Sequence, residues 1–550
     1  SLKCEYVNDG TLYTTHVVQG DPDEPHNGVR QQYIGYGMGP NQSGTGNGTI
    51  QECQIYAHVA ELPGIPEGWE MVEATLQYYM YGDGTAYSHI DCPTLEIAAY
   101  PVTEDNSNGD YQTWIEGLTW TDRPAFDNTK LLDFAIASDG TEGTYIQWDV
   151  TEQVEEWYAD RTLALVGYES PNYTANHCAV AVLNSFGTNS PPALVVKYRS
   201  AIGLESYYTY QNQNIGAAGT AYVSDYTGKL VILKNVASHA STLMPFSLNL
   251  VYNSYYRKSQ FEEVSGTGMV FGNGWKLDAV QTLTDCTGDL SNYKLYIDGD
   301  GTYHYFLKNG SVWKDENGLD LTISSVTIKD SAGTSRGDGY QIASGQGDKL
   351  CFYKGLLVQQ IDSNGNKIFY IYRGASNATG DGWLPTGSGD KLTKVIQQNK
   401  GSSTDILLAT IAYDSNGRLN SVADRMGNTT SFTYSSQMLT EIKNTNKGET
   451  AQYTYSDAQS LLEAIDKTGG YKINYTYSNT RVKSFTERAS SNGTSWSART
   501  KITVDGSRDK TTYRSPGPDG VISNNDDLLT TYLFDDEGRT INSNPTNVDK

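Results

Sequence analysis

The chain has 550 residues, of which 37% are hydrophobic and 19% charged, and its formal net charge is −24 with a pI of about 4.7. Its length predicts several domains, because one hydrophobic core stops growing at about 250–300 residues. The acidic balance argues against binding to nucleic acid or to an anionic membrane, since both need clustered Lys and Arg. The 55 glycines and 41 tyrosines favour a β-rich protein that is soluble outside the cell.

Neither end of the sequence shows a recognisable targeting signal. The chain starts with Ser-Leu-Lys-Cys, without the charged and apolar regions of a signal peptide, and no stretch of 18 apolar residues predicts membrane insertion. We therefore expect a segment of a longer protein, and the sequence leaves open whether a toxin, a core or a wall anchor comes after residue 550.

The first 199 residues contain short alternating segments that predict strands. In Val72 to Tyr81, the side chains of Ala74, Leu76, Tyr78 and Met80 fall on one face, as in a half-buried strand. Asp149 and Glu152 form a capping-box pattern that predicts a short helix, with Val150, Val154 and Trp157 as its apolar stripe. Further strands are expected at 94–100, 164–168 and 193–198.

Four phrases in this region, in this order, resemble the DNRLRE-type domain: LTWTDRPAFD (118–127), YIQWDVTEQVEEW (145–157), LALVGY (163–168) and SPPALVVKY (190–198). The resemblance implies a jelly-roll-like β-sandwich of secreted bacterial proteins, some of which bind carbohydrate. Residues 20–70 depart from the pattern, so no sugar-binding residue is carried over to this chain.

Residues 200–350 read as a second β-rich region. A hairpin is expected over 221–234 around the turn Asp225–Gly228, and a strand at Met244 to Ser254. The phrases LVYNS (250–254), FGNGW (271–275) and GDGTYHYF (299–306) resemble the region that precedes the repeats in Rhs and related YD-repeat proteins.

Residues 351–550 repeat with a period of about 21 residues. Tyr413, Tyr434, Tyr455 and Tyr477 are separated by 21, 21 and 22 residues, and YDSNGRL (413–419) and FDDEGRT (534–540) are YD-repeat phrases. This period holds two strands and two turns, so the sequence predicts one hairpin per repeat in a curved antiparallel sheet. We expect each tyrosine ring to pack on a neighbouring hairpin with its hydroxyl in water, and the open concave face to be filled by the insertion between Gly374 and Lys400.

The predicted fold class is therefore all-β: a jelly-roll-like β-sandwich (1–199), a β-rich region (200–350) and a YD/Rhs-type repeat sheet of antiparallel hairpins (351–550). The YD resemblance implies a sheet that spirals into a hollow shell in complete members. Neither the self-cleaving segment of that family nor a toxin tail is recognisable here.

Three acidic turns leave calcium as an alternative to ordinary hairpin chemistry: Asp298–Asp300, Asp315–Asp320 and Asp519–Asp527. Hairpin turns are the favoured interpretation, so we predict neither a cofactor nor a metal. The six cysteines allow 15 pairings, among which in-order pairing puts Cys4 with Cys53 first, against buried free thiols as the alternative. They are Cys4, Cys53, Cys92, Cys178, Cys286 and Cys351.

A search for catalytic motifs predicts no enzyme. The seven histidines match no metal or nucleophile motif, and neither a P-loop nor a G-x-S-x-G elbow occurs. The leading hypothesis is a non-catalytic binding or adhesion segment of a secreted or surface-attached bacterial protein. Its partner would be a glycan or a host glycoprotein, with secreted antibody as one example, and the binding residues are unknown. The alternatives are the structural opening wall of an Rhs shell in a polymorphic toxin or cell-wall protein, and a glycan-active enzyme.

Overall fold

The computed structural model describes residues 3–8, 12–26, 31–38, 50–60, 69–82, 94–104, 107–138, 141, 143–156, 162–169, 179–184, 189–256, 268–315, 318–387, 389–457, 460–478, 481–506, 510–535 and 537–547. Contacts between Cα atoms divide the chain into two compact units, residues 3–199 and residues 200–550.

The unit of residues 3–199 is built from eleven strands in the hydrogen-bonded order β1-β11-β5-β10-β3-β4-β9-β6-β7, with β2 on β4 and β8 on β5. All the pairings with a described register are antiparallel. The elements are β1 (Lys3–Asn8), β2 (Leu12–Val18), β3 (Gln31–Met38), β4 (Ile50–Val59), β5 (Trp69–Gly82), β6 (Thr94–Pro101), α1 (Tyr111–Glu116), β7 (Asp133–Ser138), β8 (Tyr145–Asp149), α2 (Thr151–Glu156), β9 (Thr162–Glu169), β10 (Ala179–Asn184) and β11 (Ala193–Ser200).

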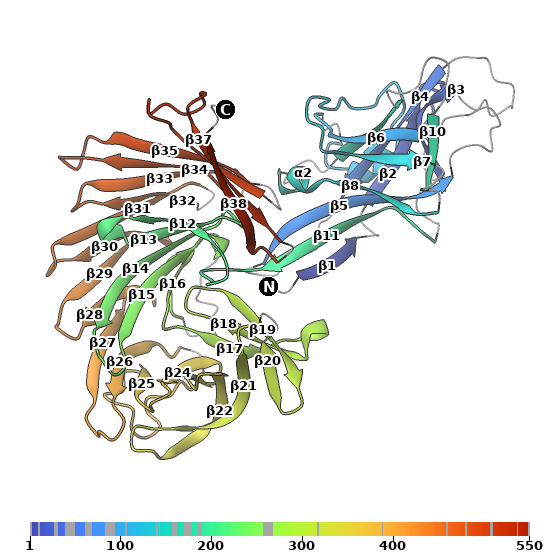
Figure 1. Ribbon diagram of the computed structural model, residues 1–550. Helices are drawn as coiled ribbons and strands as arrows, with labels where there is room; N and C mark the ends of the chain where they lie inside the picture. Colours follow the sequence, from blue (N-terminus) through green and yellow to red (C-terminus); the bar gives the residue numbers. More distant parts are fainter. Residues whose placement is uncertain are drawn as a thin grey trace. The chain divides into compact units, whose positions relative to one another are not determined.

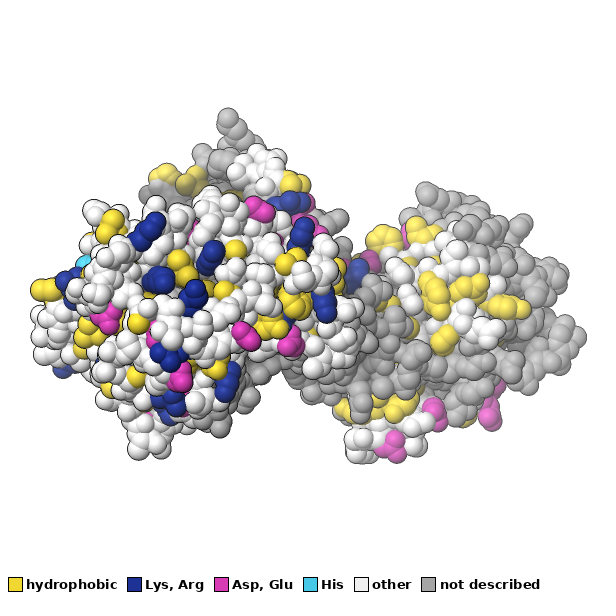
Figure 2. All heavy atoms as spheres, turned by 90° about the horizontal axis from the view of Figure 1, so that it is seen from below, with side chains coloured by type: hydrophobic (Ala, Val, Ile, Leu, Met, Phe, Trp, Pro, Cys, Tyr) yellow, Lys and Arg dark blue, Asp and Glu magenta, His cyan; other side chains and the backbone are white. Residues whose placement is uncertain are grey.

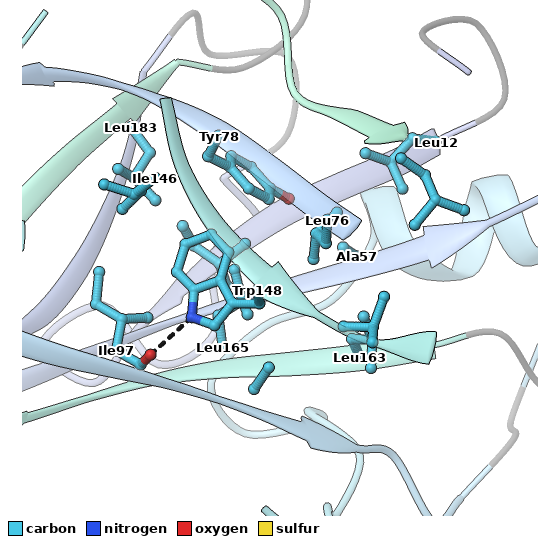
Figure 3. Packing of buried hydrophobic residues seen from close by; sticks show 14 of the residues in the cluster. Leu12, Ala57, Leu76, Tyr78, Ile97, Ile146, Trp148, Leu163, Leu165 and Leu183 are labelled. Atoms are coloured by element: carbon cyan, nitrogen blue, oxygen red, sulfur yellow. Dashed lines mark hydrogen bonds between the residues drawn. The ribbon is translucent and has the colours of Figure 1, made fainter. Parts of the chain in front are cut away.

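The sheet folds over to enclose an apolar core, which makes this unit a β-sandwich, and a second, separate apolar cluster lies around Tyr56 of β4 and Ile115 of α1. The four residues predicted to share a face of β5, Ala74, Leu76, Tyr78 and Met80, are all buried in that core. Trp148 of β8 is fully buried, and its indole N–H donates to the carbonyl of Ile97 in β6 at 2.7 Å (Figure 3). This bond ties one face of the sandwich to the other, because a buried indole N–H needs an acceptor.

The predicted short helix begins two residues after its expected cap. The Oδ1 atom of Asp149 accepts a hydrogen bond from the backbone N–H of Thr151, the first residue of α2, at 3.0 Å. Val150 lies in the core as expected, whereas the side chains of Val154 and Trp157 are outside the described residues.

The unit of residues 200–550 contains a five-stranded sheet, β12 to β16, and a 22-stranded sheet, β17 to β38, each in chain order. The five-stranded sheet comprises β12 (Tyr210–Asn214), β13 (Thr220–Ser224), β14 (Leu230–His239), β15 (Phe246–Asn253) and β16 (Trp275–Leu277). Short 3-10 helices lie at Gly216–Ala218 and Ser254–Tyr256 in this region and at Gly288–Leu290 between β17 and β18. The hairpin predicted over 221–234 and the strand predicted after Met244 are therefore confirmed, as β13–β14 and β15.

The long sheet begins as a ring. Its first eight strands return to the start, because Thr282 of β17 pairs with Leu356 of β24, and the sheet then runs on. These strands are β17 (Thr282–Asp285), β18 (Tyr293–Ile297), β19 (Tyr303–Asn309), β20 (Val312–Asp315), β21 (Leu321–Lys329), β22 (Ser335–Ser344), β23 (Lys349–Tyr353) and β24 (Leu356–Ile361). The expected boundary between residues 350 and 351 lies inside β23.

The remaining strands form the predicted repeats (Figure 1). They are β25 (Lys367–Tyr372), β26 (Leu392–Gln398), β27 (Ile406–Tyr413), β28 (Leu419–Asp424), β29 (Thr429–Ser435), β30 (Met438–Asn444), β31 (Glu449–Tyr455), β32 (Leu461–Asp466), β33 (Tyr471–Ser478), β34 (Arg481–Ala489), β35 (Ser497–Gly506), β36 (Lys510–Ser515), β37 (Leu528–Phe534) and β38 (Thr540–Asn547). Together with the sandwich, they confirm the all-β fold class.

Six hairpin turns among the described residues share the sequence D-x-x-G-x and one geometry. The Asp Oδ1 atom accepts from the backbone N–H groups two and four residues on, and the glycine has a φ between 77° and 91°. A short acidic side chain and a residue free to take positive φ are therefore what this turn requires. The turns begin at Asp298, Asp330, Asp362, Asp414, Asp424 and Asp535.

The tyrosines of the repeats do not leave their hydroxyls in water, contrary to the expectation. Each hydroxyl donates to a leucine carbonyl near the start of an earlier strand, at 2.6–3.0 Å. The pairs are Tyr372 to Leu357, Tyr413 to Leu392, Tyr434 to Leu419, Tyr455 to Leu439 and Tyr477 to Leu461. Each tyrosine thus ties its own strand to the strand before it with a hydrogen bond.

The insertion after Gly374 does not fill the concave side of the repeats, so this prediction is wrong. Its Trp383 is buried against Phe369 of β25, at 5.5 Å between ring centroids, and its carbonyl accepts from the N–H of Tyr372. The insertion therefore packs on the strand that it follows.

The five-stranded sheet lies within the curve of the repeat strands instead (Figure 1). Hydrogen bonds join the two sheets from Trp275 Nε1 to the Tyr455 hydroxyl at 2.8 Å and from the Tyr453 hydroxyl to the carbonyl of Ala218 at 2.8 Å. We call residues 210–277 the plug.

The cysteines with described side chains are free thiols. Cys53 is buried and unpaired, so the expected Cys4–Cys53 disulfide is wrong, and Cys286 and Cys351 are unpaired as well. Burial raises the pKa of Cys53 to about 12, which makes it an inert core residue. The side chains of Cys4, Cys92 and Cys178 are outside the described residues.

Candidate functional site

A buried group of ionisable side chains lies where residues 201–205 run beside the β18–β19 hairpin. His304 Nε2 is 2.8 Å from Asp298 Oδ2 and 3.4 Å from Glu205 Oε1. The three side chains are only 4–16% exposed. We call this group the carboxylate–histidine cluster.

The local sequence explains how the cluster forms. Asp298 opens a D-x-x-G-x turn, whose glycine is Gly301. The incoming segment binds this turn directly, because the N–H of Gly203 donates to Thr302 Oγ1 at 2.7 Å. A Cβ atom at Gly203 would lie 2.1 Å from Asp300 Oδ1, so the close approach requires a glycine.

The surroundings shift the pKa values of Glu205, Asp298 and His304, and of the neighbouring Asp300, in different directions. Burial raises the pKa of Glu205 to about 7, with help from Asp298 and opposition from His304. Burial and the charge of Asp298 raise the pKa of Asp300 well above its usual range. Burial alone would lower the pKa of His304, but the hydrogen bond and charge of Asp298 and the charge of Glu205 raise it instead. Burial would raise the pKa of Asp298, yet its bond with His304 holds it low.

This arrangement suits an internal ion pair. Two carboxylates and an imidazole, whose donor atoms lie within 4.8 Å of one another, are a set that a transition-metal ion accepts. The hydrogen bond and charge of Asp298 raise the pKa of His304, which favours a positive imidazolium beside the carboxylates, and His304 Nδ1 is buried without a hydrogen-bond partner. We interpret the carboxylate–histidine cluster as a structural contact that holds residues 201–205 against the β18–β19 hairpin.

A cavity of about 340 Å³ lies at β17, β18, β22 and β23. The ammonium group of Lys294, which lines it, lies 3.8 Å from the ring centre of Tyr340 and 4.5 Å from that of Trp313, and pairs with Asp285 Oδ1 at 2.5 Å. The cation is therefore already bound by the chain's own rings and carboxylate, so it adds no free positive charge to the cavity.

In the first of the three acidic turns considered for calcium, the carboxylate is already used in protein hydrogen bonds, and the second is incompletely described. In the first, Asp298 accepts from two backbone N–H groups on Oδ1 and contacts His304 through Oδ2. In the second, Asp315 Oδ2 accepts from the N–H of Leu319, and residues 316 and 317 are outside the described residues. In the third, at 516–527, the Oδ1 atoms of Asp526 and Asp527 are buried without a donor, as is Asp315 Oδ1 in the second turn.

The sandwich exposes an apolar strip on neighbouring strands. Phe134 and Ile136 of β7 are 52% and 45% exposed, and Tyr168 of β9 is 42% exposed. Glu96 of β6 pairs with both Ile136 and Tyr168, so these three side chains form one row across the sheet. Figure 2 shows hydrophobic side chains gathered on the face of this unit that it presents. We call Phe134, Ile136 and Tyr168 the apolar strip; no sequence motif marked it.

Comparisons with known proteins add little to this picture. No protein-family model matches the chain, so the DNRLRE resemblance stays a prediction. No curated protein matches either. Among the described residues, no helix is long and apolar enough to cross a membrane.

Solved structures of low similarity were found. The Photorhabdus luminescens Tc holotoxin pore with the TccC3-D651A mutation is 12% identical over 60% of this chain and 16% of that chain, with a TM-score of 0.25. The crystal structure of TcdB2-TccC3 is 11% identical over 90% of this chain and 27% of that chain, with a TM-score of 0.26. The chain thus spans about a quarter or less of the length of these proteins. Likeness of this size carries no functional argument, so the fold assignment depends on the chain's own strands.

Proposed function

We propose that residues 200–550 are the opening wall of an Rhs-type shell, a structural and non-catalytic role in a secreted or surface-attached bacterial protein. The observation that carries this proposal is the course of the 22-stranded sheet, which closes a ring at β17 and β24 and then continues hairpin by hairpin. A sheet that advances past its own starting strand has the geometry of a spiral wall.

The filled inner side supports the same role. The plug covers the repeat strands with bonds from buried groups such as Trp275, so this part of the wall carries its own lining. A lined wall of repeating hairpins has a mechanical task and needs no ligand to be complete.

Electron microscopy of the full-length gene product tests the proposal. We expect a hollow shell in which residues 282–547 form successive strands of the wall. A rod, or separate beads joined by linkers, would refute the shell.

A second candidate function, binding through the sandwich, is favoured by the apolar strip. An exposed strip in which Tyr168 is the cross-strand neighbour of Glu96 suits a sugar ring, which stacks on an aromatic face and donates hydroxyl hydrogen bonds to a carboxylate. A glycan array and a pull-down from serum test this function and include secreted antibody among the candidate partners. Binding should be lost on Phe134→Ser with Tyr168→Ser and kept on the control Tyr81→Ser, whose ring is 59% exposed elsewhere on the unit. No binding by the unaltered chain in either assay would reject it.

A further inference from the structure

Three donor atoms from separate parts of the chain converge in the carboxylate–histidine cluster of Glu205, Asp298 and His304. The ligand atoms of the three side chains all lie within 4.8 Å of one another. Among the residues that the structure describes, no other three His, Cys, Asp or Glu side chains bring their ligand atoms this close together. Because Glu205 comes from a segment far from the β18–β19 hairpin in sequence, the convergence is a product of the fold and not of one acidic turn.

Hydrogen bonds on the far side of Asp298 aim its carboxylate at the imidazole. Asp298 Oδ1 accepts from the backbone N–H groups of Asp300 and Thr302, each at 3.0 Å. The Oδ2 atom is thereby left to face His304 Nε2 at 2.8 Å. Outer partners that orient a carboxylate in this way are a regular feature of metal sites.

The imidazole of His304 is able to present a lone pair to an ion. Its side chain is 4% exposed, and its Nδ1 atom is buried without a hydrogen-bond partner. In a neutral imidazole, the bonds made by one nitrogen decide whether the other carries the proton. Since no donor at Nδ1 forces the proton onto Nε2, the Nε2 atom is free to bind a metal.

Negative groups outnumber positive ones around the imidazole. Asp300 of the same turn adds a third carboxylate, whose Oδ1 accepts from Thr302 Oγ1 at 2.6 Å. The ammonium group of the buried Lys276 donates to the backbone carbonyl of Asp298. Carboxylates that are withdrawn from water in excess of cations are costly, and a divalent ion between Glu205 and Asp298 offsets that cost.

The donor set and its spacing select zinc. One imidazole nitrogen with carboxylate oxygens suits a borderline ion such as zinc, whereas calcium and magnesium prefer oxygen donors alone. Zinc bonds of about 2.0–2.1 Å in a tetrahedral site put neighbouring donor atoms about 3.3 Å apart. His304 Nε2 is 3.4 Å from Glu205 Oε1 and 2.8 Å from Asp298 Oδ2. Ligation therefore needs Asp298 and His304 to separate by only about 0.5 Å.

We propose that Glu205 Oε1, Asp298 Oδ2 and His304 Nε2 bind one zinc ion, with water in the fourth position. The ion takes the place of the proton between His304 and Asp298 and joins residues 201–205 to the β18–β19 hairpin. The inference goes beyond the shell and does not depend on it, since a zinc site here would stabilise residues 200–550 in any role.

Isothermal titration of the whole chain with zinc chloride, after removal of metal with a chelator, tests the proposal. We expect one saturable site with a Kd on the order of 10⁻⁶ M, weaker than in four-ligand structural sites because the protein supplies three ligands. Glu205→Gln and His304→Gln should each weaken zinc binding at least tenfold. The matched controls Glu449→Gln and His239→Gln should leave it unchanged, because these side chains pair with Lys234 and Arg425 outside the cluster.

X-ray absorption at the zinc edge identifies the ligands in the unaltered chain, should a variant fail to fold. We expect a shell of nitrogen and oxygen atoms with one imidazole and no sulfur. Absence of saturable zinc binding, equally strong binding of calcium, unaltered binding by a folded Glu205→Gln chain, or a shell with sulfur or with several imidazoles would each overturn the site.

Discussion

The link between the plug and the repeats gives a quantitative prediction at Tyr455. Its hydroxyl donates to the carbonyl of Leu439 at 2.6 Å and accepts from the indole N–H of Trp275 at 2.8 Å. Tyr434 makes only the first kind of bond, to Leu419 at 3.0 Å. Tyr434→Phe therefore removes one hydrogen bond, whereas Tyr455→Phe removes two.

The expected costs differ because Trp275 is fully buried. Losing the bond to a leucine carbonyl costs about 1 kcal/mol, so Tyr434→Phe should lower the free energy of unfolding by about that amount. Tyr455→Phe also leaves the indole N–H without an acceptor, which adds about 1–3 kcal/mol, for a total of about 3 kcal/mol.

Urea unfolding of the whole chain, followed by near-UV circular dichroism, measures both values. A double-mutant cycle isolates the link: Trp275→Phe with Tyr455→Phe should cost about 2 kcal/mol less than the sum of the single changes, because the orphaned N–H is gone. Equal costs for Tyr434→Phe and Tyr455→Phe, or additive costs in the cycle, would refute the plug contact.

Two further predictions concern the cluster and the turns. The folded-state pKa values of Glu205, about 7 against 4.5, and of His304 are raised, which gives stability that is fully present at low pH and lost as pH rises. The free energy of unfolding in urea should therefore fall between pH 5 and 8 by up to about 3 kcal/mol, and Glu205→Gln should flatten the curve. A free energy of unfolding that rises with pH would contradict this. Gly417→Ala should destabilise the chain more than Gly427→Ala in thermal unfolding. Both glycines have φ near 80°, so an alanine at either costs about 1 kcal/mol of stability, but only a Cβ at Gly417 would lie 2.3 Å from the carbonyl oxygen of Gly268. Equal losses of stability would show that the Gly268 contact is absent.

The strands and turns were predictable because their causes are local. Alternation of apolar and polar residues along Ala74 to Met80 identifies the buried face of β5. The Asp and Gly of YDSNGRL specify their own turn through hydrogen bonds within five residues. The recurring tyrosines likewise gave the hairpin period correctly.

The features that could not be predicted depend on contacts between distant segments. The hydroxyl of Tyr455 was expected in water, because nothing near it in sequence reveals that Trp275 covers it. Glu205 and His304 lie far apart in sequence and meet only in the folded chain, and the Asp298–Gly–Asp300–Gly phrase was their sole local signal. Cys53 was assigned a partner by order alone, which says nothing of the core that surrounds it.

The bond from each repeat tyrosine has a consequence for how the repeat sheet is held together. Since Tyr434 and Tyr477 each reach back to a leucine carbonyl of the preceding strand, the strand that carries the tyrosine is tied to the strand before it. At its start the sheet closes on itself through the pairing of β17 with β24, and the plug contacts the later strands through bonds such as that from Tyr453 to Ala218. Each further hairpin then extends the sheet by the same local rule, as in other repeat proteins.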